Sequence, residues 1–377
     1  MLIKNGLVFT EECRFEPLSV LTEDGVITGV LPADAMIKYG GEVVDASGCY
    51  VVPGLTDIHF HGCAGHDLCE GTAEAISCIA EFEYSQGVTT ICPATMTLPD
   101  EDIAEILRTA GEYTKNSADK DRAKLIGVHL EGPFISPEKF GAQKKELIQP
   151  PSADKLRAWQ SISGGLIKLV TIAPETDGAI ECIRQLSGSM RFSLGHTSCD
   201  YDTAVEAFGA GADHITHMYN AMPPFNHRAP SLIGAAFDTA GVFAEIICDG
   251  VHVSETAVRA AFRLFGDDRM ILISDSMEAA GMPDGEYQLG GQRVSVKGNR
   301  AVLSDGTLAG SVTPLADCLR TAVKMGIPIE IALKAATINP CRSIGEDKKY
   351  GSISVGKAAH ILLLDREDLS LKAVYTR

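Results

Sequence analysis

Hydrophobic and polar residues follow two different patterns along this chain. In residues 1–50, short apolar stretches are separated by the turn signals Asn5-Gly6 and Asp24-Gly25, a pattern typical of strands joined by tight turns. From residue 51 onward, short apolar runs alternate with longer amphipathic segments. These runs predict eight buried strands at Val51–His59, Val88–Ala94, Leu125–Glu131, Ile167–Ile172, Arg191–His196, His214–Met218, Phe243–Cys248 and Met270–Asp275.

The segments between these runs have the spacing of amphipathic helices. The clearest are Thr72–Ser85, Asp102–Tyr113, Ala153–Trp159 and Tyr201–Ala210. Eight alternations of strand and helix within roughly 220 residues are typical of an α/β protein with a TIM-like (β/α)8 barrel. The pattern therefore predicts that fold for the central part of the chain.

Strand-like sequence returns after the eighth run and at the C-terminal end. The Gly-rich stretch 285–310 predicts a β insertion, and helices are expected over Thr313–Met325 and Ile329–Thr337. The tail Gly351–Ala373 again predicts strands. A strand-rich head and tail that bracket a barrel predict one small β-sandwich domain built from both termini, so we expect domains at 1–52 plus 350–377 and at 53–349.

Composition narrows the classes of partner. The 33 Lys and Arg and 50 Asp and Glu give a net charge of −17, which argues against nucleic acid and anionic membranes as partners. The 11 cysteines contain no CxxC pair, as expected for reduced thiols in the cytoplasm. The N-terminal residues do not resemble a signal peptide, and no apolar run approaches the ~18 residues of a spanning helix.

Polar residues of metal-binding type recur where the predicted strands end. Because the active sites of such barrels lie at the carboxyl ends of the strands, residues far apart in sequence are expected to meet there. The set comprises His59 and His61, Glu131, His196, His217 and Asp275, and the seventh run leads to His252. This recurrence is more specific than any single motif.

The residue types indicate metal-assisted hydrolysis. Imidazole and carboxylate suit zinc or a similar divalent ion, and a three-ligand set of Glu131, His196 and His217 leaves a position for water. His59 and His61 share one face of a strand and can approach an ion together. A metal acidifies its water and polarises a carbonyl group, and Asp275 can accept the proton and pass it to a leaving amine.

Each of these residues also has a structural interpretation. His196 can be a hydrogen-bonded core histidine, Glu131 can cap a turn, and Arg228 can form a surface ion pair. His129 has the same strand parity as Glu131, so spacing alone makes it a ligand as well. The motifs GxxxxGK[ST], GxGxxG, GxSxG and HExxH do not occur. The sequence therefore does not support a phosphate-loop NTPase, a Rossmann oxidoreductase or a nucleophile-elbow hydrolase.

The chain resembles the amidohydrolase superfamily and, within it, the N-acetylglucosamine-6-phosphate deacetylase family, nearly from end to end. The motifs HLEGPF and NAM…HR are specific to that family. The resemblance is carried by Pro53–Gly62, His129–Phe134, Gly195–Thr197, Thr216–Met222, His227-Arg228, Asp249–His252, Ser274–Ser276 and Asp305–Gly310.

The resemblance implies specific roles. Glu131, His196 and His217 would bind the main metal, and His59 and His61 would bind a second ion bridged by Glu131. The implied cofactor is therefore one or two divalent ions, zinc first and iron or another transition metal as alternatives. Asp275 would be the catalytic acid and base, with His252 or His129 helping to stabilise the oxyanion. The implied substrate contacts are Ala142, Asn220, Ala221, Arg228, His252, Leu308, Ala309 and Gly310.

The implied reaction removes the acetyl group of N-acetyl-D-glucosamine 6-phosphate, in amino-sugar catabolism and recycling. The expected assembly is a homodimer or higher homo-oligomer, with Arg228 acting across a dimer interface. Gln143 and Ser231 depart from the family pattern, since some members carry His and Gly there, and relatives often continue beyond Arg377. The alternatives are an amidohydrolase for a different N-acyl sugar or cyclic amide, and a catalytically silent scaffold, which the retained ligands disfavour.

Overall fold

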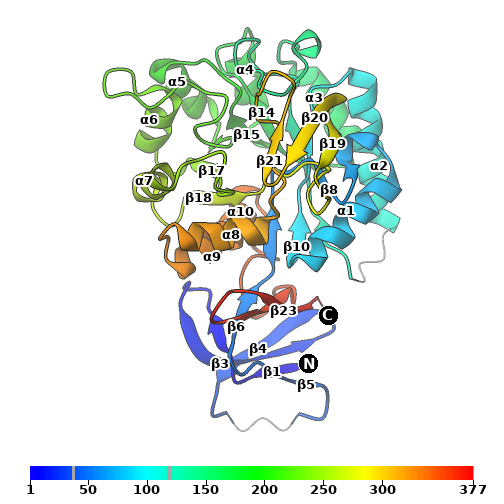
Figure 1. The fold of residues 1–377 in the computed structure, drawn as a ribbon, viewed down its shortest axis with the longest axis vertical. Helices are drawn as coiled ribbons and strands as arrows, with labels where there is room; N and C mark the ends of the chain where they lie inside the picture. The colour runs from blue at the N-terminus through cyan, green and yellow to red at the C-terminus, as the bar shows by residue number, and fades with distance from the viewer. Residues whose placement is uncertain (36–38, 117–120, 377) are drawn as a thin grey trace.

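The computed structural model describes residues 1–35, 39–116 and 121–376. Figure 1 shows a large upper part, in which helices surround parallel strands, above a smaller part made of strands. Both chain termini lie in the smaller part, so the first and last segments of the chain meet there. No helix among the described residues is long and apolar enough to cross a lipid bilayer.

The smaller part is one eight-stranded sheet with the order β23-β22-β6-β2-β3-β1-β5, and β4 pairs with β3. Asp24 and Gly25 both have positive φ angles, 49° and 74°, and form the predicted tight turn between β3 and β4. Asn5-Gly6 forms a bend between β1 and β2, but these strands each pair with β3 and not with each other. The strands are β1 Leu2–Lys4, β2 Leu7–Phe9, β3 Phe15–Glu23, β4 Val26–Pro32, β5 Val43–Asp45, β6 Cys49–Pro53, β22 Ile361–Asp365 and β23 Leu371–Tyr375.

The upper part contains two parallel sheets, with the orders β12-β10-β7 and β11-β13-β14-β15-β16-β17-β18. Every one of the eight predicted runs contributes a strand to them. The Asp275 amide donates to the His59 carbonyl over 2.9 Å, which joins the end of the last strand to the end of the first. The strands are β7 Leu55–Asp57, β10 Val88–Ile91, β11 Ala94–Thr95, β12 Lys124–Leu125, β13 Val128–Glu131, β14 Ile167–Ile172, β15 Arg191–Leu194, β16 His214–Ile215, β17 Phe243–Ile247 and β18 Met270–Ile273.

Three of the predicted runs are broken in two. The first run divides at Pro53-Gly54, so β6 joins the terminal sheet while β7 joins a parallel one. A Cβ atom on Gly54 would lie 2.0 Å from Oγ1 of Thr89, so only glycine fits this crossing. The second run divides at Pro93, which has no N–H to donate to a neighbouring strand.

Helices cover the outside of the parallel strands (Figure 1). They begin where the sequence supplies caps: the Thr72 hydroxyl accepts from the Ala75 amide at the start of α1, and Asp200 accepts from Thr203 at the start of α5. The helices are α1 Ala73–Ser85, α2 Asp100–Asn116, α3 Ala153–Ile162, α4 Ala179–Leu186, α5 Tyr201–Ala210, α6 Ser231–Asp238, α7 Glu255–Phe265, α8 Leu315–Lys324, α9 Ile329–Ala336 and α10 Ile338–Ser343, with 3-10 turns at Leu68–Glu70 and Lys145–Leu147.

The predicted β insertion is a three-stranded antiparallel sheet of β19 Gly285–Leu289, β20 Gln292–Lys297 and β21 Arg300–Val302. Leu289 in this sheet and Leu308 just after it line the main cavity. The short two-stranded sheet of β8 Gly62–Cys63 and β9 His66–Asp67 follows the first parallel strand. The insertion therefore forms one wall of the space at the strand ends.

Candidate active site

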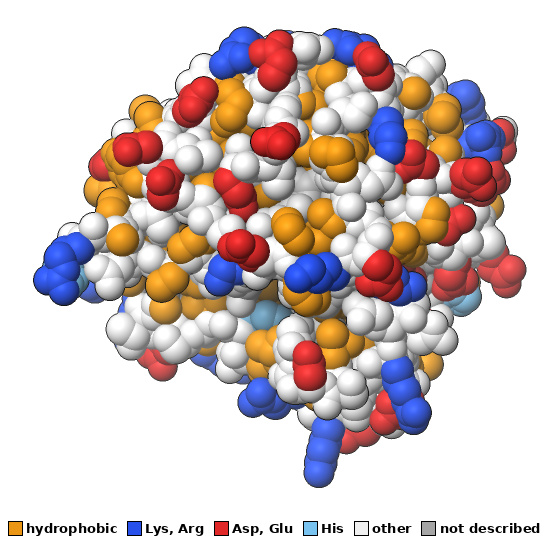
Figure 2. Space-filling model, turned by 90° about the horizontal axis from the view of Figure 1, so that it is seen from above, with side chains coloured by type: hydrophobic (Ala, Val, Ile, Leu, Met, Phe, Trp, Pro, Cys, Tyr) orange, Lys and Arg blue, Asp and Glu red, His pale blue; other side chains and the backbone are white. Residues whose placement is uncertain are grey.

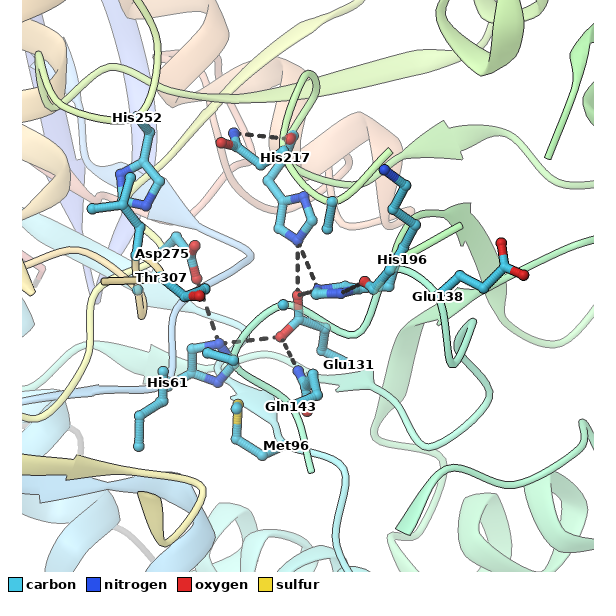
Figure 3. A pocket seen from close by; sticks show the side chains of 18 residues that line it. His61, Met96, Glu131, Glu138, Gln143, His196, His217, His252, Asp275 and Thr307 are labelled. Carbon is cyan, nitrogen blue, oxygen red and sulfur yellow. Dashed lines mark hydrogen bonds and ion pairs between the residues drawn. The ribbon is translucent and has the colours of Figure 1, made fainter. Parts of the chain in front are cut away.

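A cavity of about 370 Å³ lies at the carboxyl ends of the parallel strands. This volume is within the roughly 300–1,000 Å³ of small-molecule sites. Figure 2 looks onto the molecule from above, and pale blue imidazole atoms are visible near its centre. The cavity brings together His61, Glu131, His196, His217 and Asp275, as Figure 3 shows.

Glu131, His196 and His217 form a compact set of ligand atoms. Oε1 of Glu131 lies 3.1 Å from Nε2 of each histidine, and the two Nε2 atoms are also 3.1 Å apart. Nδ1 of His196 lies 2.8 Å from the Lys139 carbonyl, which can only accept, so Nδ1 carries a proton and Nε2 is the ring atom that faces the group. Two ligands on one tetrahedral zinc ion are about 3.4 Å apart, so this donor set fits a metal ion after a small expansion.

A second group consists of His59, His61 and Asp275, all buried. Oδ1 of Asp275 lies 3.4 Å from Nε2 of His61 and 3.8 Å from Nε2 of His59. Glu131 contacts this group as well, with Oε1 3.3 Å from Nε2 of His59 and Oε2 3.2 Å from Nε2 of His61. The Glu131 carboxylate thus lies between the two groups, as a bridging ligand would.

The electrostatics of these groups favour a cation. Burial opposes ionisation of Glu131, but the charge of His59 and the hydrogen bond from His196 hold its pKa well below the usual range. Burial likewise opposes ionisation of Asp275, and the hydrogen bond from His61 lowers its pKa. Burial disfavours the charged form of His61, but hydrogen bonds to Asp275 and Glu131 raise its pKa to about 10. Two buried carboxylates therefore need positive charge, which protonated imidazoles supply in the metal-free chain.

Three of these residues have a left-handed backbone. The φ angles are 46° at His196, 29° at His217 and 49° at Asp275, and each residue stands two positions after the end of its strand. Left-handed backbone costs a residue with a Cβ atom roughly 1–2 kcal/mol. Such conformations gather at functional sites because the surrounding structure compensates for them.

Gln143 fixes the second oxygen of Glu131. Its Nε2 donates to Oε2 of Glu131 over 2.8 Å, and its Oε1 accepts from the Thr97 amide over 2.6 Å. Gln143 is 3% exposed. The sequence identified this position only as a departure from the family pattern, because the contact with Thr97 links residues 46 positions apart.

The expected substrate contacts fall into three places. Six of them line the cavity, whereas Ala309 is fully buried and Arg228 lies on an exposed loop outside it. His252 is oriented by Asp249, whose Oδ2 lies 2.7 Å from its Nδ1. The six residues at the cavity are Ala142, Asn220, Ala221, His252, Leu308 and Gly310.

Sequence reasoning missed several residues of the cavity wall. Lys139 is the only Lys or Arg among the described residues that line it. Its signal was its position two residues before Gly141-Ala142, in the loop after the third run. The other residues found only in the structure are Met96, Glu138, Gly141, Leu289 and Thr307.

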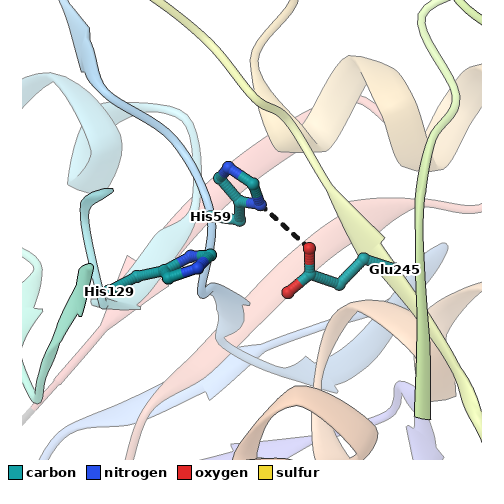
Figure 4. A group of neighbouring side chains, drawn as sticks. All are labelled: His59, His129 and Glu245. Atoms are coloured by element: carbon teal, nitrogen blue, oxygen red, sulfur yellow. Dashed lines mark hydrogen bonds and ion pairs between the residues drawn. The ribbon is translucent and has the colours of Figure 1, made fainter. Parts of the chain in front are cut away.

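His129, which spacing left open as a ligand, lies beneath the cavity and is fully buried. Its Nε2 is 2.8 Å from Oγ1 of Thr171. Burial, together with the charge of His59, holds its pKa well below the usual range, so the ring is neutral. Figure 4 shows it beside His59 and Glu245.

Comparison with known proteins agrees with this geometry. The sequence model of the Amidohydrolase family matches residues 50–376. The N-acetylglucosamine-6-phosphate deacetylase of Bacillus subtilis (strain 168) is 37% identical, over 97% of this chain and 93% of the relative. The N-acetylgalactosamine-6-phosphate deacetylase of Escherichia coli O157:H7 is 31% identical, over 95% of this chain and 93% of the relative.

A solved structure extends the similarity to the whole fold. A mutant N-acetyl-D-glucosamine-6-phosphate deacetylase from Mycobacterium smegmatis, in complex with N-acetyl-D-glucosamine-6-phosphate, superposes with a TM-score of 0.92 and is 29% identical. The match covers 100% of this chain and 97% of that one. The family match, the full-length relatives and the ligand groups at the strand ends lead to one conclusion: this chain belongs to the amidohydrolase family.

Proposed function

We propose that this chain is a metal-dependent hydrolase that converts N-acetyl-D-glucosamine 6-phosphate to D-glucosamine 6-phosphate and acetate, in amino-sugar catabolism and recycling. The observation that carries the proposal is the convergence of Glu131, His196, His217 and Asp275 on one cavity. The name of the Bacillus subtilis relative and the compound bound in the Mycobacterium smegmatis structure support this substrate.

In this proposal Glu131, His196 and His217 would hold the main ion, and His59 and His61, together with Glu131, would hold a second one. Zinc is the first choice, because imidazole and carboxylate are its usual nitrogen and oxygen ligands, and iron or another transition metal is the alternative. Such an ion, when bound, lowers the pKa of a water and polarises the acetyl carbonyl. The 3.1 Å separations within the first group support this assignment.

Asp275 is the proposed acid and base. Its lowered pKa leaves it ionised at neutral pH, so it can accept a proton from the attacking water. It then delivers that proton to the amine nitrogen of the leaving amino sugar. His252 is the proposed oxyanion donor: burial disfavours its charged form, but the hydrogen bond to Asp249 raises its pKa, and its Nε2 remains free to donate.

The proposed sugar contacts are Ala142, Asn220, Ala221, Leu308, Ala309 and Gly310, and Lys139 adds a positive charge for the phosphate. Arg228 lies outside the cavity of its own chain, which supports the proposal of a homodimer in which a partner chain supplies it. The eleven free cysteines support a reducing compartment, so the cytosol is part of the proposal.

We also propose that the two parallel sheets are parts of one (β/α)8 barrel, residues 53–349, beside a small β-sandwich of residues 1–52 and 350–377. The hydrogen bond from Asp275 to His59 supports closure of the barrel. The separate apolar cluster that includes Ile3, Val20 and Ile361 supports a second domain with its own core.

The test is acetate release from three substrates: N-acetyl-D-glucosamine, its 6-phosphate, and N-acetyl-D-galactosamine 6-phosphate. The galactosamine arm is included because the Escherichia coli O157:H7 relative bears that name. We expect the glucosamine phosphate to react fastest, and equal rates with and without phosphate would rule out a phosphate-specific enzyme. Asp275→Asn should lower kcat by at least about 100-fold with metal content retained. Near-full activity of that variant would exclude the proposed mechanism, and no acetate release by metal-replete protein would favour a silent scaffold.

A further inference from the structure

A buried polar layer lies directly beneath the cavity. His59, His129 and Glu245 form this inner group, and the side chains of all three are fully buried (Figure 4). They come from the end of the first parallel strand, from β13 and from β17. Neither His129 nor Glu245 lines the cavity, so neither can touch a substrate there.

One oxygen of Glu245 contacts two residues of the ligand groups. Oε2 lies 2.9 Å from Nδ1 of His59 and accepts the backbone N–H of His217 over 3.2 Å. A carboxylate oxygen accepts, so His59 donates from Nδ1, and Nε2 is the ring atom left for a metal ion. That Nε2 faces Oε1 of Glu131 at 3.3 Å. Glu245 therefore holds the side chain of His59, in the second ligand group, and the backbone of His217, in the first.

The inner group itself does not have the geometry of a metal site. The 2.9 Å between Glu245 and His59 is a hydrogen-bond length, shorter than the about 3.4 Å expected for two ligands of one tetrahedral ion. His129 has its Nε2 occupied by the Thr171 hydroxyl, which continues to Thr216 over 2.9 Å. The His129 ring packs edge-on against His59 at 4.4 Å. These contacts hold the His59 ring from two sides and leave its Nε2 as the outward atom.

Glu245 lies at a position where a charged side chain is energetically unfavourable. It is the only charged residue of β17, Phe243–Ile247, and its neighbours Ala244 and Ile246 are fully buried. Burying an ionised carboxylate costs several kcal/mol unless it is paired. Its hydrogen bonds to His59 and to the His217 backbone join it to the site, so a role in supporting the ligands accounts for its presence in an apolar strand.

We infer that Glu245 is a positioning residue that couples the two ligand groups, by holding His59 in the tautomer that presents Nε2 and by anchoring the backbone of His217. The inference rests on the metal-dependent function proposed above. Carboxylates that orient ligating histidines commonly change metal affinity by 10- to 100-fold when they are removed. Glu245 then acts on metal affinity and on turnover without contributing to substrate binding.

The test compares zinc affinity, by competition with a chromogenic chelator, in metal-free wild type and variants. Glu245→Met keeps the length of the side chain and removes the acceptor, so we expect zinc to bind about 10- to 100-fold more weakly. Glu245→Gln retains an oxygen that can accept from His59 and should recover most of that loss. The matched control is Glu83→Gln, a fully buried glutamate of α1 outside both ligand groups, which should stay within about twofold of wild type.

Turnover gives a second readout. In zinc-saturated Glu245→Met, kcat should fall while KM stays within about twofold, since the residue does not line the cavity. Wild-type zinc affinity in a Glu245→Met protein with a native circular dichroism spectrum would overturn the inference. If that variant fails to fold, the ring ¹⁵N shifts of His59 in the zinc-loaded wild type decide: protonated Nδ1 supports the inference, and protonated Nε2 overturns it. Zinc affinity and ring shifts need no substrate, so failure of the proposed deacetylation would appear separately.

Discussion

Replacing Gln143 by methionine tests whether the bridging carboxylate is held by its buried partners. Methionine has nearly the same length and volume as glutamine, so Gln143→Met leaves little cavity. It removes the 2.8 Å bond to Oε2 of Glu131 and the 2.6 Å bond from the Thr97 amide. The perturbation is therefore the loss of two buried hydrogen bonds with the shape of the site preserved.

The expected cost can be worked out bond by bond. Thr97 is 1% exposed, so water cannot replace the acceptor that its amide loses, and a buried unpaired N–H costs about 1–3 kcal/mol. Oε2 of Glu131 keeps His61 at 3.2 Å, which limits the loss there to about 1 kcal/mol. The free energy of unfolding of the metal-free protein should therefore fall by about 2–4 kcal/mol.

Gln149→Met is the matched control. Gln149 also donates to a carboxylate over 2.8 Å, that of Asp100, but this pair is partly exposed and should contribute less than about 1 kcal/mol. Urea unfolding can be followed by the fluorescence of Trp159, the single tryptophan, which stacks on Phe134 at 5.9 Å. An equal loss of stability in the two variants would refute the assignment of Gln143 as a support of Glu131.

Three further outcomes are expected. Burial raises the pKa of Glu83 to about 8, so the contribution of Glu83 to stability is largest below about pH 4.5 and declines as pH rises toward 8. Glu83→Gln should remove this part of the pH dependence and add roughly 3 kcal/mol to the free energy of unfolding at pH 7, as measured by urea unfolding of both proteins at several pH values. Gly54→Ala would place a Cβ atom 2.0 Å from Oγ1 of Thr89 and should lower stability by about 1–3 kcal/mol or more; an unchanged thermal midpoint would contradict this. Lys139→Ala should raise KM for the phosphorylated sugar about tenfold or more with little change in kcat, and an equal rise for the unphosphorylated sugar would exclude a phosphate contact.

The pattern of apolar runs predicted the positions of the parallel strands because such strands are buried on both faces and read as continuous hydrophobic stretches. It did not predict where those runs break. The division at Gly54 depends on the close approach of Thr89, a residue 35 positions away, and such a contact leaves no local signal. In the tail, 351–360 lies outside the strands, although Ile361–Asp365 and Leu371–Tyr375 form them.

The site was predictable to the extent that strand ends collect functional residues in barrels. That rule brought His59, Glu131 and Asp275 together, and in the structure Nε2 of His59 lies 3.3 Å from Oε1 of Glu131 and 3.8 Å from Oδ1 of Asp275. The sequence did not predict that Gln143 and Glu245 support the ligands, because both act through contacts with residues far away in the sequence. Glu245 did leave one signal, a lone charge in an otherwise apolar strand.

The left-handed turns at His196, His217 and Asp275 have a consequence for protein engineering. β-Branched residues are especially poorly tolerated at positive φ, whereas Asn and Asp are accepted there, so backbone tolerance alone would bias a mutant library at these positions toward Asn, Asp and Gly. A designer who moves only the side chains onto another barrel would place them on extended backbone, pointing along the strands. Transplanting this active site therefore means transplanting three strand-end turns, with the chemistry carried by the loop conformation as much as by the residue types.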